Sequence, residues 1–221
     1  MPISRYIDHT LLKAAATEDD ILQICKEAAE YGFYAVCVNS CYVPLCKESL
    51  AGLGVKIAAV IGFPLGAMSN KSKTEEAKNA VADGAEEVDM VINIGLLKSG
   101  KHSEVESEIR MVKQTIGKNT LKVIIETCYL SDEEKKIATQ LTVNAGADFV
   151  KTSTGFGPGG ATIEDVILMK SVTKGSIQIK ASGGIRDYET AKRYIDMGVT
   201  RIGTSNGIQI VTGQKGMEGN Y

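Results

Sequence analysis

Histidine is scarce in this sequence. Its 221 residues include only His9 and His102, too few imidazoles for a histidine-rich catalytic metal centre. The five cysteines are odd in number and none forms a Cys-x-x-Cys pair, so we expect neither a disulfide framework nor a zinc site. These absences predict a reduced, cytoplasmic protein that binds no metal.

Long apolar runs and a strong charge of either sign are also missing. No segment approaches the roughly 18 apolar residues that a membrane span needs. The opening residues Met1–Tyr6 lack the apolar core of a signal peptide. The 25 basic and 27 acidic residues give a net charge of −2, which provides no electrostatic footprint for nucleic acid or for an anionic membrane. Neither is therefore expected as a partner.

A recurring pattern organises the chain: a helical stretch ends in glycine and passes directly into an apolar strand. Glycine suits the end of a helix because it tolerates the left-handed conformation. The pattern occurs at residues 31–36, 83–88, 145–150 and 197–202. Further strands are expected at Val55–Ile61, Leu121–Glu126 and Ile177–Lys180, with a short opening strand near Tyr6–Asp8.

The segments between these strands have helical periodicity, and three begin with a capping box or an acidic first turn: Thr17–Asp20, Ser131–Glu134 and Thr162–Asp165. About eight strands alternating with helices imply parallel βα units. We therefore predict an α/β fold, a single-domain (β/α)8 TIM barrel over residues 1–212, followed by a flexible tail at 213–221. An open doubly wound sheet is the alternative, although no Gly-x-Gly-x-x-Gly follows the first strand.

Three charged residues fall on strand faces that should point into the barrel. Side chains alternate between the two faces of a strand, so an apolar face of Val88, Met90 and Ile92 against the helices turns Asp89 inward. The same alternation turns Lys151 and Lys180 inward. Both lysines are expected where buried strands end, and catalytic residues of such barrels lie at the carboxyl ends of the strands.

These residue types point to Schiff-base chemistry. A buried lysine costs several kcal/mol unless it is paired or neutral, and a neutral lysine can form an imine with a carbonyl compound. Two neighbouring ammonium groups suppress each other's protonation, and Asp89 can hold the second ammonium and take part in proton transfer. The alternative is that these residues form structural ion pairs, or that a lysine caps a strand at the surface.

Two glycine-rich segments near the end of the chain suggest a phosphate site. Gly183–Arg186 follows the seventh expected strand, and Gly203–Gly207 follows the eighth. Barrels commonly bind phosphate with these two loops, whose backbone N–H groups point at the oxyanion. Gly155 can add another donor. Plain turn glycines are the alternative; the position of the loops favours a phosphorylated carbonyl substrate.

The segments Val150–Phe156 and Ile179–Arg186 closely resemble the signature segments of the deoxyribose-phosphate aldolase family. The similarity extends over nearly the whole chain and includes Ile7–Lys13, Ala35–Asn39, Val60–Gly66, Glu87–Asn93 and Lys122–Thr127. The resemblance implies a class I aldolase without metal or cofactor, which reversibly cleaves 2-deoxy-D-ribose 5-phosphate to acetaldehyde and D-glyceraldehyde 3-phosphate. It also implies a catabolic role in nucleoside salvage. A homodimer is a further expectation.

The resemblance also assigns roles to single residues. Lys151 would form the imine, while Lys180 would lower its pKa and relay protons with Asp89. Further matched positions are Asp8 and Lys122, which line the family's active site, and Gly155, Gly183, Gly184, Gly203 and Ser205, which bind its phosphate. The C-terminal Tyr221 matches a pattern in which the tail folds over the site and assists proton exchange; a disordered, dispensable tail is the alternative.

Two departures from the family pattern affect the loops and leave the lysines intact. Asn206 stands where the family often has a second serine, so an amide would replace one hydroxyl donor to phosphate. The segment Asn39–Tyr42 lacks the proline that is common after that asparagine. Cys37, on the inward face beside Asn39, is expected to be a small buried hydrophobic residue. Another Schiff-base barrel aldolase and a noncatalytic sugar-phosphate-binding barrel are the rival functions.

Overall fold

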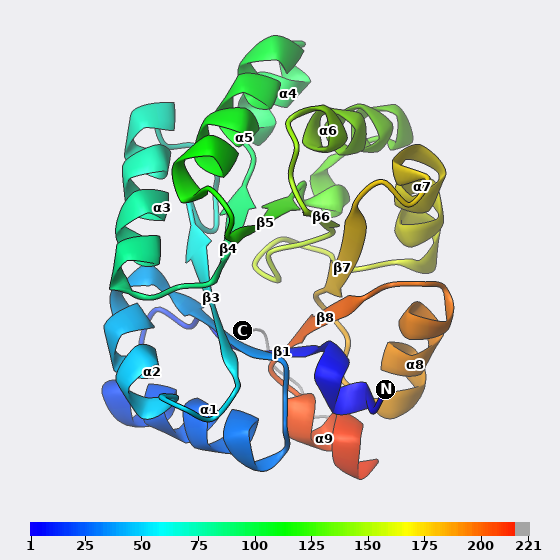
Figure 1. Ribbon diagram of the computed structural model, residues 1–221. Coiled ribbons are helices and arrows are strands. Elements are labelled where there is room, and N and C mark those ends of the chain that lie inside the picture. Colours follow the sequence, from blue (N-terminus) through cyan, green and yellow to red (C-terminus); the bar gives the residue numbers. More distant parts are fainter. Residues whose placement is uncertain (215–221) are drawn as a thin grey trace.

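Eight parallel strands close into a barrel, and the helices form a ring around it (Figure 1). The structure is a computed structural model, and it describes residues 1–214. Each strand pairs in parallel with the next one, and β8 returns to pair with β1. The strands are β1 (Ile7–Leu11), β2 (Ala35–Asn39), β3 (Lys56–Ile61), β4 (Glu87–Val91), β5 (Thr120–Ile124), β6 (Phe149–Lys151), β7 (Gln178–Ser182) and β8 (Arg201–Thr204). The predicted (β/α)8 barrel is confirmed, and the open sheet is excluded.

The helices cover the outside of the barrel in chain order. The α-helices are α1 (Glu18–Glu30), α2 (Val43–Ser49), α3 (Asn70–Asp83), α4 (Ile94–Lys98), α5 (His102–Ile116), α6 (Asp132–Asn144), α7 (Ile163–Thr173), α8 (Tyr188–Asp196) and α9 (Gly207–Thr212). Three short 3₁₀ turns are η1 (Ile3–Tyr6), η2 (Ser40–Tyr42) and η3 (Thr127–Tyr129). Across residues 1–214, none of the helices has the length and apolar character that crossing a membrane requires.

Strand boundaries differ from the expected ones at two functionally important places. The strand expected over Leu121–Glu126 ends at Ile124, because Glu126 adopts the left-handed conformation with φ 53° and ψ 68°. The strand expected to end at Lys180 continues to Ser182, which places Lys180 in the middle of β7. Lys151 is the last residue of β6, as predicted. The expectation of two lysines at strand ends is therefore right for Lys151 and wrong for Lys180.

The predicted helix signals are confirmed in their local geometry. Gly32, Gly84, Gly146 and Gly198 all have positive φ where a helix gives way to a strand. Thr17 with Asp20 and Ser131 with Glu134 form reciprocal capping boxes. At the start of α7 the Thr162 hydroxyl accepts from the backbone N–H of Asp165, but the capping box is not completed. The Asp165 carboxylate lies 2.7 Å from Lys135 Nζ instead of accepting from the backbone N–H of Thr162. The capping signals in the sequence thus set where these helices begin.

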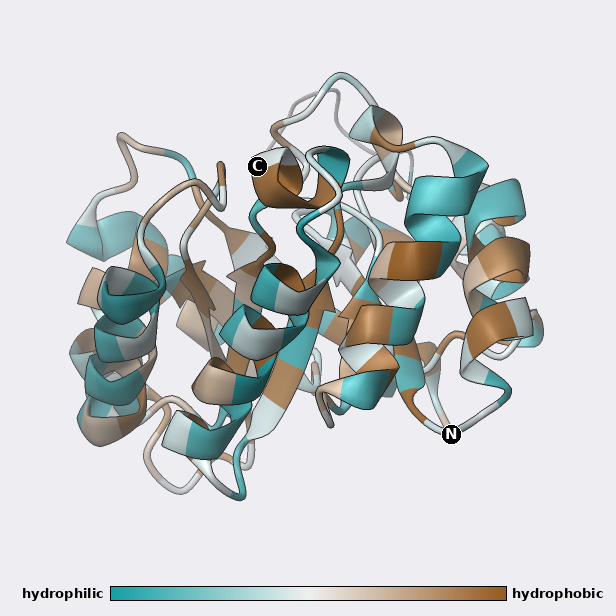
Figure 2. Ribbon diagram, turned by 90° about the horizontal axis from the view of Figure 1, so that it is seen from above, coloured by the Kyte–Doolittle hydropathy of each residue, from teal (hydrophilic) through white to brown (hydrophobic). Residues whose placement is uncertain are grey.

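The apolar core lies between the strands and the helices, as the alternation of side chains predicts. Val88, Met90 and Ile92 belong to a large buried cluster between the barrel and its helices. In the view turned by 90° from that of Figure 1, the helices carry both hydrophobic and hydrophilic bands (Figure 2). The barrel interior holds a separate, much smaller apolar cluster of Leu12, Cys37, Ala58 and Val60, against which Phe63 packs. Most of the space inside the barrel is therefore left to polar groups.

A buried ion pair outside the barrel fixes the carboxyl end of β4. Lys73 of α3 and Glu108 of α5 are fully buried, with Lys73 Nζ 2.7 Å from Glu108 Oε1. Lys73 also donates to the carbonyl oxygens of Gly66 at 3.0 Å and Val91 at 2.7 Å. The second Glu108 oxygen accepts from the backbone N–H of Asn93 at 3.1 Å. Two helices, the β3–α3 loop and the end of β4 therefore meet at one pair of charges.

Replacing Glu108 with alanine should destabilise the protein strongly. The Lys73 ammonium would remain buried without its anion, which costs about 3–5 kcal/mol in the free energy of unfolding. The matched control is Glu75→Ala on α3, which breaks an exposed pair with Lys78 and should cost less than about 1 kcal/mol. Urea denaturation measures both. Equal losses in the two variants would show that burial of the pair does not matter to stability.

Candidate active site

Seven charged side chains from six strands meet inside the barrel. All are at most 4% exposed, so water is nearly excluded from them. The acidic members are Asp8, Glu87 and Asp89, and the basic members are Lys122, Lys151, Lys180 and Arg201. We call this set the interior charge cluster. Because charges are strongly disfavoured away from water, each member needs a partner, and the geometry of these pairs defines the site.

Asp89 is the centre of the cluster. Its Oδ2 accepts from Lys151 Nζ and from Lys180 Nζ, each at 2.8 Å. Its Oδ1 accepts from Lys122 Nζ at 2.8 Å. The structure therefore brings together the three residues that the strand-face argument selected, Asp89, Lys151 and Lys180, with both lysines on the same carboxylate oxygen.

Asp8 and Glu87 form a second layer of carboxylates beneath Asp89. Asp8 accepts from Lys180 at 2.5 Å and from Arg201 at 2.8 Å. Glu87 accepts from Lys122 at 2.5 Å and from Arg201 at 2.9 Å. Asp8 and Lys122 were expected in this region, whereas Glu87 and Arg201 were not. Period 2 could have found Glu87, because it precedes Asp89 by two residues on the same face of the strand. Arg201 gave no such signal, because Gly203 was expected beyond the end of its strand.

The balance of charge singles out Lys151. Burial lowers the pKa of Lys151, and the Lys180 ammonium adds to this effect against the opposing attraction of Asp89. Burial also acts to lower the pKa of Lys180 and Lys122, but neighbouring carboxylates outweigh it and leave both pKa values raised. Although burial opposes it, the three lysines hold the pKa of Asp89 well below its usual range. Lys151 is thus the lysine of the cluster most disposed to lose its proton.

The loop after Lys151 is held by Glu126, a residue that the sequence analysis treated as the end of a strand. Glu126 is 2% exposed and accepts from the backbone N–H of Thr154 at 3.1 Å and from the Thr154 hydroxyl. Burial raises the pKa of Glu126, against the effect of the Thr154 bonds. A left-handed conformation at a residue other than glycine is strained, and such strain is common beside active sites. Glu126 fixes the segment that carries Lys151.

Cys37 lies on the inward face, as expected, and behaves as a small buried residue. Its side chain is fully buried, and burial raises the pKa of its thiol against the influence of the nearby lysines. Among residues 1–214 all five cysteines are free. Cys37 is therefore a neutral thiol beside the charge cluster.

The expected phosphate residues lie in the loops after β6, β7 and β8, with one exception. Gly155, Gly183 and Gly184 have φ of 87°, 86° and 80°. Gly183 packs closely on Gly160, since a Cβ on Gly183 would come within 2.8 Å of the Gly160 Cα. Gly184 is exposed, and a Cβ there would meet nothing within 4 Å. The β6–α7 and β7–α8 loops therefore lie in contact, with open space above Gly184.

Gly203 lies within β8 instead of following it, which corrects the expected strand end. A Cβ at this position would lie 2.9 Å from the Ser182 Cβ and 3.0 Å from the Lys180 Cε. Its lack of a side chain makes room for Lys180. After β8, Ser205 is partly exposed, and the buried Asn206 donates its backbone N–H to the Thr204 hydroxyl at 2.9 Å. Tyr221, the remaining candidate, lies outside the described residues.

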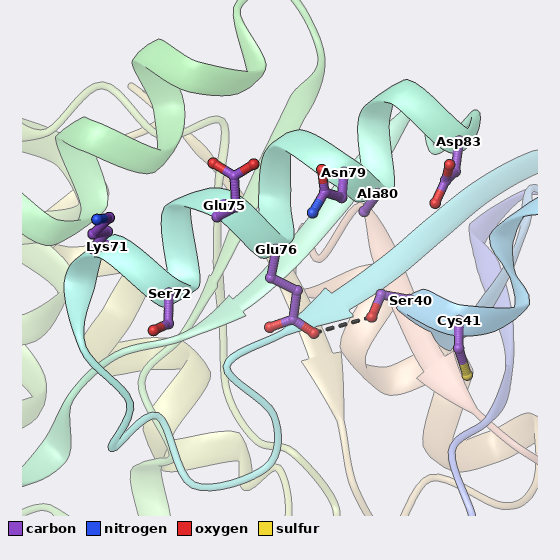
Figure 3. Close-up of a pocket in the computed structure, with 9 residues that line it drawn as sticks. All are labelled: Ser40, Cys41, Lys71, Ser72, Glu75, Glu76, Asn79, Ala80 and Asp83. Atoms are coloured by element: carbon purple, nitrogen blue, oxygen red, sulfur yellow. Dashed lines mark hydrogen bonds between the residues drawn. The ribbon is translucent and has the colours of Figure 1, made fainter.

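A groove elsewhere in the molecule does not contribute to this site. It has a volume of about 740 Å³ and lies between η2 and α3, where Figure 3 shows its lining residues. The Glu76 carboxylate in this groove accepts from the Ser40 hydroxyl at 3.0 Å and from the Gly62 N–H at 2.9 Å. These bonds join the loops after β2 and β3 to α3, so Glu76 has a structural task. The atypical segment Asn39–Tyr42 is anchored here.

Comparisons with known proteins agree with this geometry. The family model described as DeoC/LacD family aldolase matches residues 3–214. A deoxyribose-phosphate aldolase from Brevibacillus brevis is 53% identical over 221 residues, 100% of both chains. The solved aldolase QR15 is 46% identical with a TM-score of 0.92, covering 95% of this chain and 94% of that one. A tetrameric deoxyribose phosphate aldolase from Aeropyrum pernix is 33% identical with a TM-score of 0.86, covering 95% and 89%.

Adding a methyl group at Gly203 should disturb the charge cluster. In Gly203→Ala the new Cβ would press on Ser182 and Lys180, and overpacking of this kind costs about 1–3 kcal/mol. Gly184→Ala is the matched control, because its Cβ would contact no other atom. Only the strain of an alanine with positive φ, about 1–2 kcal/mol, should then lower the free energy of unfolding. A crystal structure of Gly203→Ala should show Lys180 displaced from Asp89. An unmoved Lys180 would refute the close fit.

Proposed function

The chain belongs to the DeoC/LacD family of aldolases, and we propose that it reversibly cleaves 2-deoxy-D-ribose 5-phosphate to D-glyceraldehyde 3-phosphate and acetaldehyde. The observation that carries the proposal is the pair of lysines, Lys151 and Lys180, on one oxygen of the buried Asp89. One of the two has a lowered pKa and the other a raised one. The name of the relative from Brevibacillus brevis supports the choice of substrate.

The first step is imine formation at Lys151. The free amine attacks C1 of the open-chain sugar, and the resulting carbinolamine loses water to give a protonated imine. The charged Lys180 keeps the neighbouring amine free, because a second cation beside Asp89 is disfavoured. Asp89 accepts and returns the protons of these steps, and Asp8 and Lys122 hold Lys180 and Asp89 in place.

The protonated imine then acts as an electron sink. The C3 hydroxyl gives its proton to the relay formed by Asp89 and Lys180, the C2–C3 bond breaks, and its electron pair forms an enamine joined to Lys151. D-glyceraldehyde 3-phosphate leaves with C3 as its aldehyde carbon. Protonation of the enamine at C2 and hydrolysis of the imine release acetaldehyde and restore the Lys151 amine. Asp89 and Lys180 supply the proton for C2, and we assign the same step to Tyr221 as a further proton donor.

The phosphate of the substrate is assigned to the loops after β6, β7 and β8. Backbone N–H groups of Gly155, Gly183 and Gly184 and the hydroxyl of Ser205 are suitable donors to the oxyanion. Asn206 would supply an amide where the family often has a serine. For Gly203 the contact with Lys180 favours a packing role over direct binding of phosphate. The exposed position of Gly184 supports entry of the phosphate from solvent.

The setting of the enzyme follows from the same proposal. We place it in the cytoplasm and in the catabolic branch of nucleoside salvage, where deoxyribose phosphate is consumed. For the assembly we propose a homodimer, whereas the Aeropyrum pernix relative is described as a tetramer. Light scattering on the purified protein would distinguish the two.

Treatment with acetaldehyde and borohydride should add one ethyl group to Lys151 and abolish the activity. The physical reason is that Lys151 is the lysine of the cluster with a lowered pKa, so its amine loses a proton more readily than those of Lys122 and Lys180. Peptide mapping by mass spectrometry locates the adduct. Lys151→Arg, which stays charged, serves as the unreactive control.

Three outcomes would count against this assignment. An adduct on Lys180 with Lys151 unmodified would reverse the roles of the two lysines. Release of dihydroxyacetone or pyruvate in place of acetaldehyde from test substrates would indicate a different Schiff-base aldolase. Failure of the wild-type protein to form any adduct would favour a noncatalytic sugar-phosphate-binding barrel.

The variant Ser205→Glu should weaken binding of the phosphorylated substrate selectively. A carboxylate beside the assigned phosphate position repels the oxyanion, so we expect KM for deoxyribose 5-phosphate to rise at least about 10-fold, equivalent to about 1.4 kcal/mol. The kcat/KM for unphosphorylated deoxyribose should change little. Ser205→Ala is the control for loss of the hydroxyl alone. Equal losses on both substrates would place the phosphate elsewhere.

A further inference from the structure

Arg201 has no part in the proposed chemistry, yet it is one of the most constrained residues in the barrel. It is the first residue of β8 and is 4% exposed. Its guanidinium lies 3.5 Å from the centre of the Tyr34 ring and 5.5 Å from that of Phe149. A cavity of about 340 Å³ at the amino ends of the strands is lined by these three residues and by Arg5. Arg201 therefore closes the end of the barrel opposite the lysine-bearing loops.

Two chains of ion pairs connect Arg201 to Asp89. Along the first, Arg201 binds Asp8 at 2.8 Å, Asp8 binds Lys180 at 2.5 Å, and Lys180 binds Asp89 at 2.8 Å. Along the second, Arg201 binds Glu87 at 2.9 Å, Glu87 binds Lys122 at 2.5 Å, and Lys122 binds Asp89 at 2.8 Å. Each of the two lower carboxylates thus lies between the guanidinium on one side and a lysine on the other.

This arrangement leaves Lys151 with the fewest anionic partners. Lys180 contacts two carboxylates and Lys122 contacts all three. Over residues 1–214, Lys151 has one carboxylate partner, Asp89. The Asp89 oxygen that it contacts, Oδ2, is also bound by Lys180. The cluster holds four basic and three acidic side chains. The loss of one proton would therefore make it electrically neutral, and Lys151 is the group held least firmly by anions.

We propose that Arg201 is a positioning residue of the active site, which holds Asp8 and Glu87 against Lys180 and Lys122 so that Lys151 is the interior cation that releases its proton. The proposal rests on the imine-forming role of Lys151 proposed above. Arg201 touches neither Lys151 nor the substrate site. It acts by supplying the fourth positive charge of the cluster and by holding the carboxylates of Asp8 and Glu87 from the amino ends of the strands.

Guanidinium chemistry suits this task better than an ammonium group would. Arg201 Nη1 donates to both Asp8 and Glu87, and Nη2 reaches the second Glu87 oxygen at 3.3 Å. A planar fork can span two carboxylates and stack on an aromatic ring at the same time. Burial opposes its charge, but Asp8 and Glu87 outweigh burial and leave the pKa of Arg201 raised. Arg201 therefore keeps its proton more firmly than Lys151, whose pKa is lowered.

Removal of the Arg201 charge changes the balance around Lys151 in a defined direction. The groups that act most directly on Lys151 are Asp89 on β4, Lys180 on β7, Cys37 on β2 and Glu126 after β5, and the charge of Arg201 adds to their effect through the cluster. In Arg201→Met three acidic and three basic groups remain, so the cluster is neutral when Lys151 is protonated. The free amine of Lys151 should then appear only at higher pH.

The test measures the rate of borohydride trapping with acetaldehyde as a function of pH. In Arg201→Met the midpoint of the profile should rise by about one pH unit or more, which lowers the trapping rate near pH 7 about 10-fold. Arg201→Lys restores the charge and should return the midpoint most of the way to the wild-type value. The matched control is Arg5→Met: Arg5 lies 5.3 Å from the same Tyr34 ring and donates to the Phe33 carbonyl, outside the charge cluster. Its profile should match that of the wild type.

Removal of an anion instead of a cation gives an independent test. Glu87→Gln removes an anion from the second layer, so the midpoint should fall instead of rise. Glu87→Gln tests the proposal by itself if circular dichroism shows that Arg201→Met does not fold. Unchanged midpoints in folded Arg201→Met or Glu87→Gln, or shifts of the opposite sign, would overturn the role of Arg201. Absence of trapping in the wild-type protein would instead overturn the proposed function itself.

Discussion

The sharing of one buried carboxylate among three lysines is the constraint on which the rest of this structure depends. Asp89 is fully buried and binds Lys122, Lys151 and Lys180 at 2.8 Å each. An unpaired charge in such a place costs several kcal/mol, so the strands must deliver these groups in register. They do so by pairing Asp89 with Lys122 and Lys151 with Lys180 as direct neighbours. Closure of the barrel and assembly of the site are therefore a single event.

The interior is divided between a charged side and an apolar side. The inward residues of β2 and β3, Cys37, Ala58 and Val60, are small or aliphatic, and Phe63 packs on them. The charged side chains come from the other six strands. A substrate that reaches Lys151 would thus have uncharged walls on one side and proton-transfer groups on the other. Such a division suits a carbonyl compound that must lose and gain protons in the proposed reaction.

Local rules predict much of this fold, and contacts between distant segments decide the rest. Alternation of side chains is local, so it correctly placed Asp89 and Lys151 inside the barrel. The extent of β7 depends on its pairing with β8, which no pattern within residues 176–182 encodes. Arg201 and Glu87 are 114 residues apart in sequence, and their contact exists only because the barrel closes. The packing of Gly203 against Lys180 also depends on closure of the barrel, so the local sequence does not reveal it. From the sequence alone, Gly203 was therefore expected in a turn at the phosphate site.

Two separate ion systems fix the strand that carries Asp89. Inside the barrel, Lys122 binds both Glu87 and Asp89, the first and third residues of β4. Outside the barrel, Lys73 holds the Val91 carbonyl, and Glu108 holds the Asn93 N–H just after the strand ends. The helix pair α3 and α5 thus restrains the backbone of β4 from the face opposite to the lysines. A carboxylate that contacts three lysines tolerates little movement, and support from both faces of β4 holds Asp89 in place for the proposed chemistry.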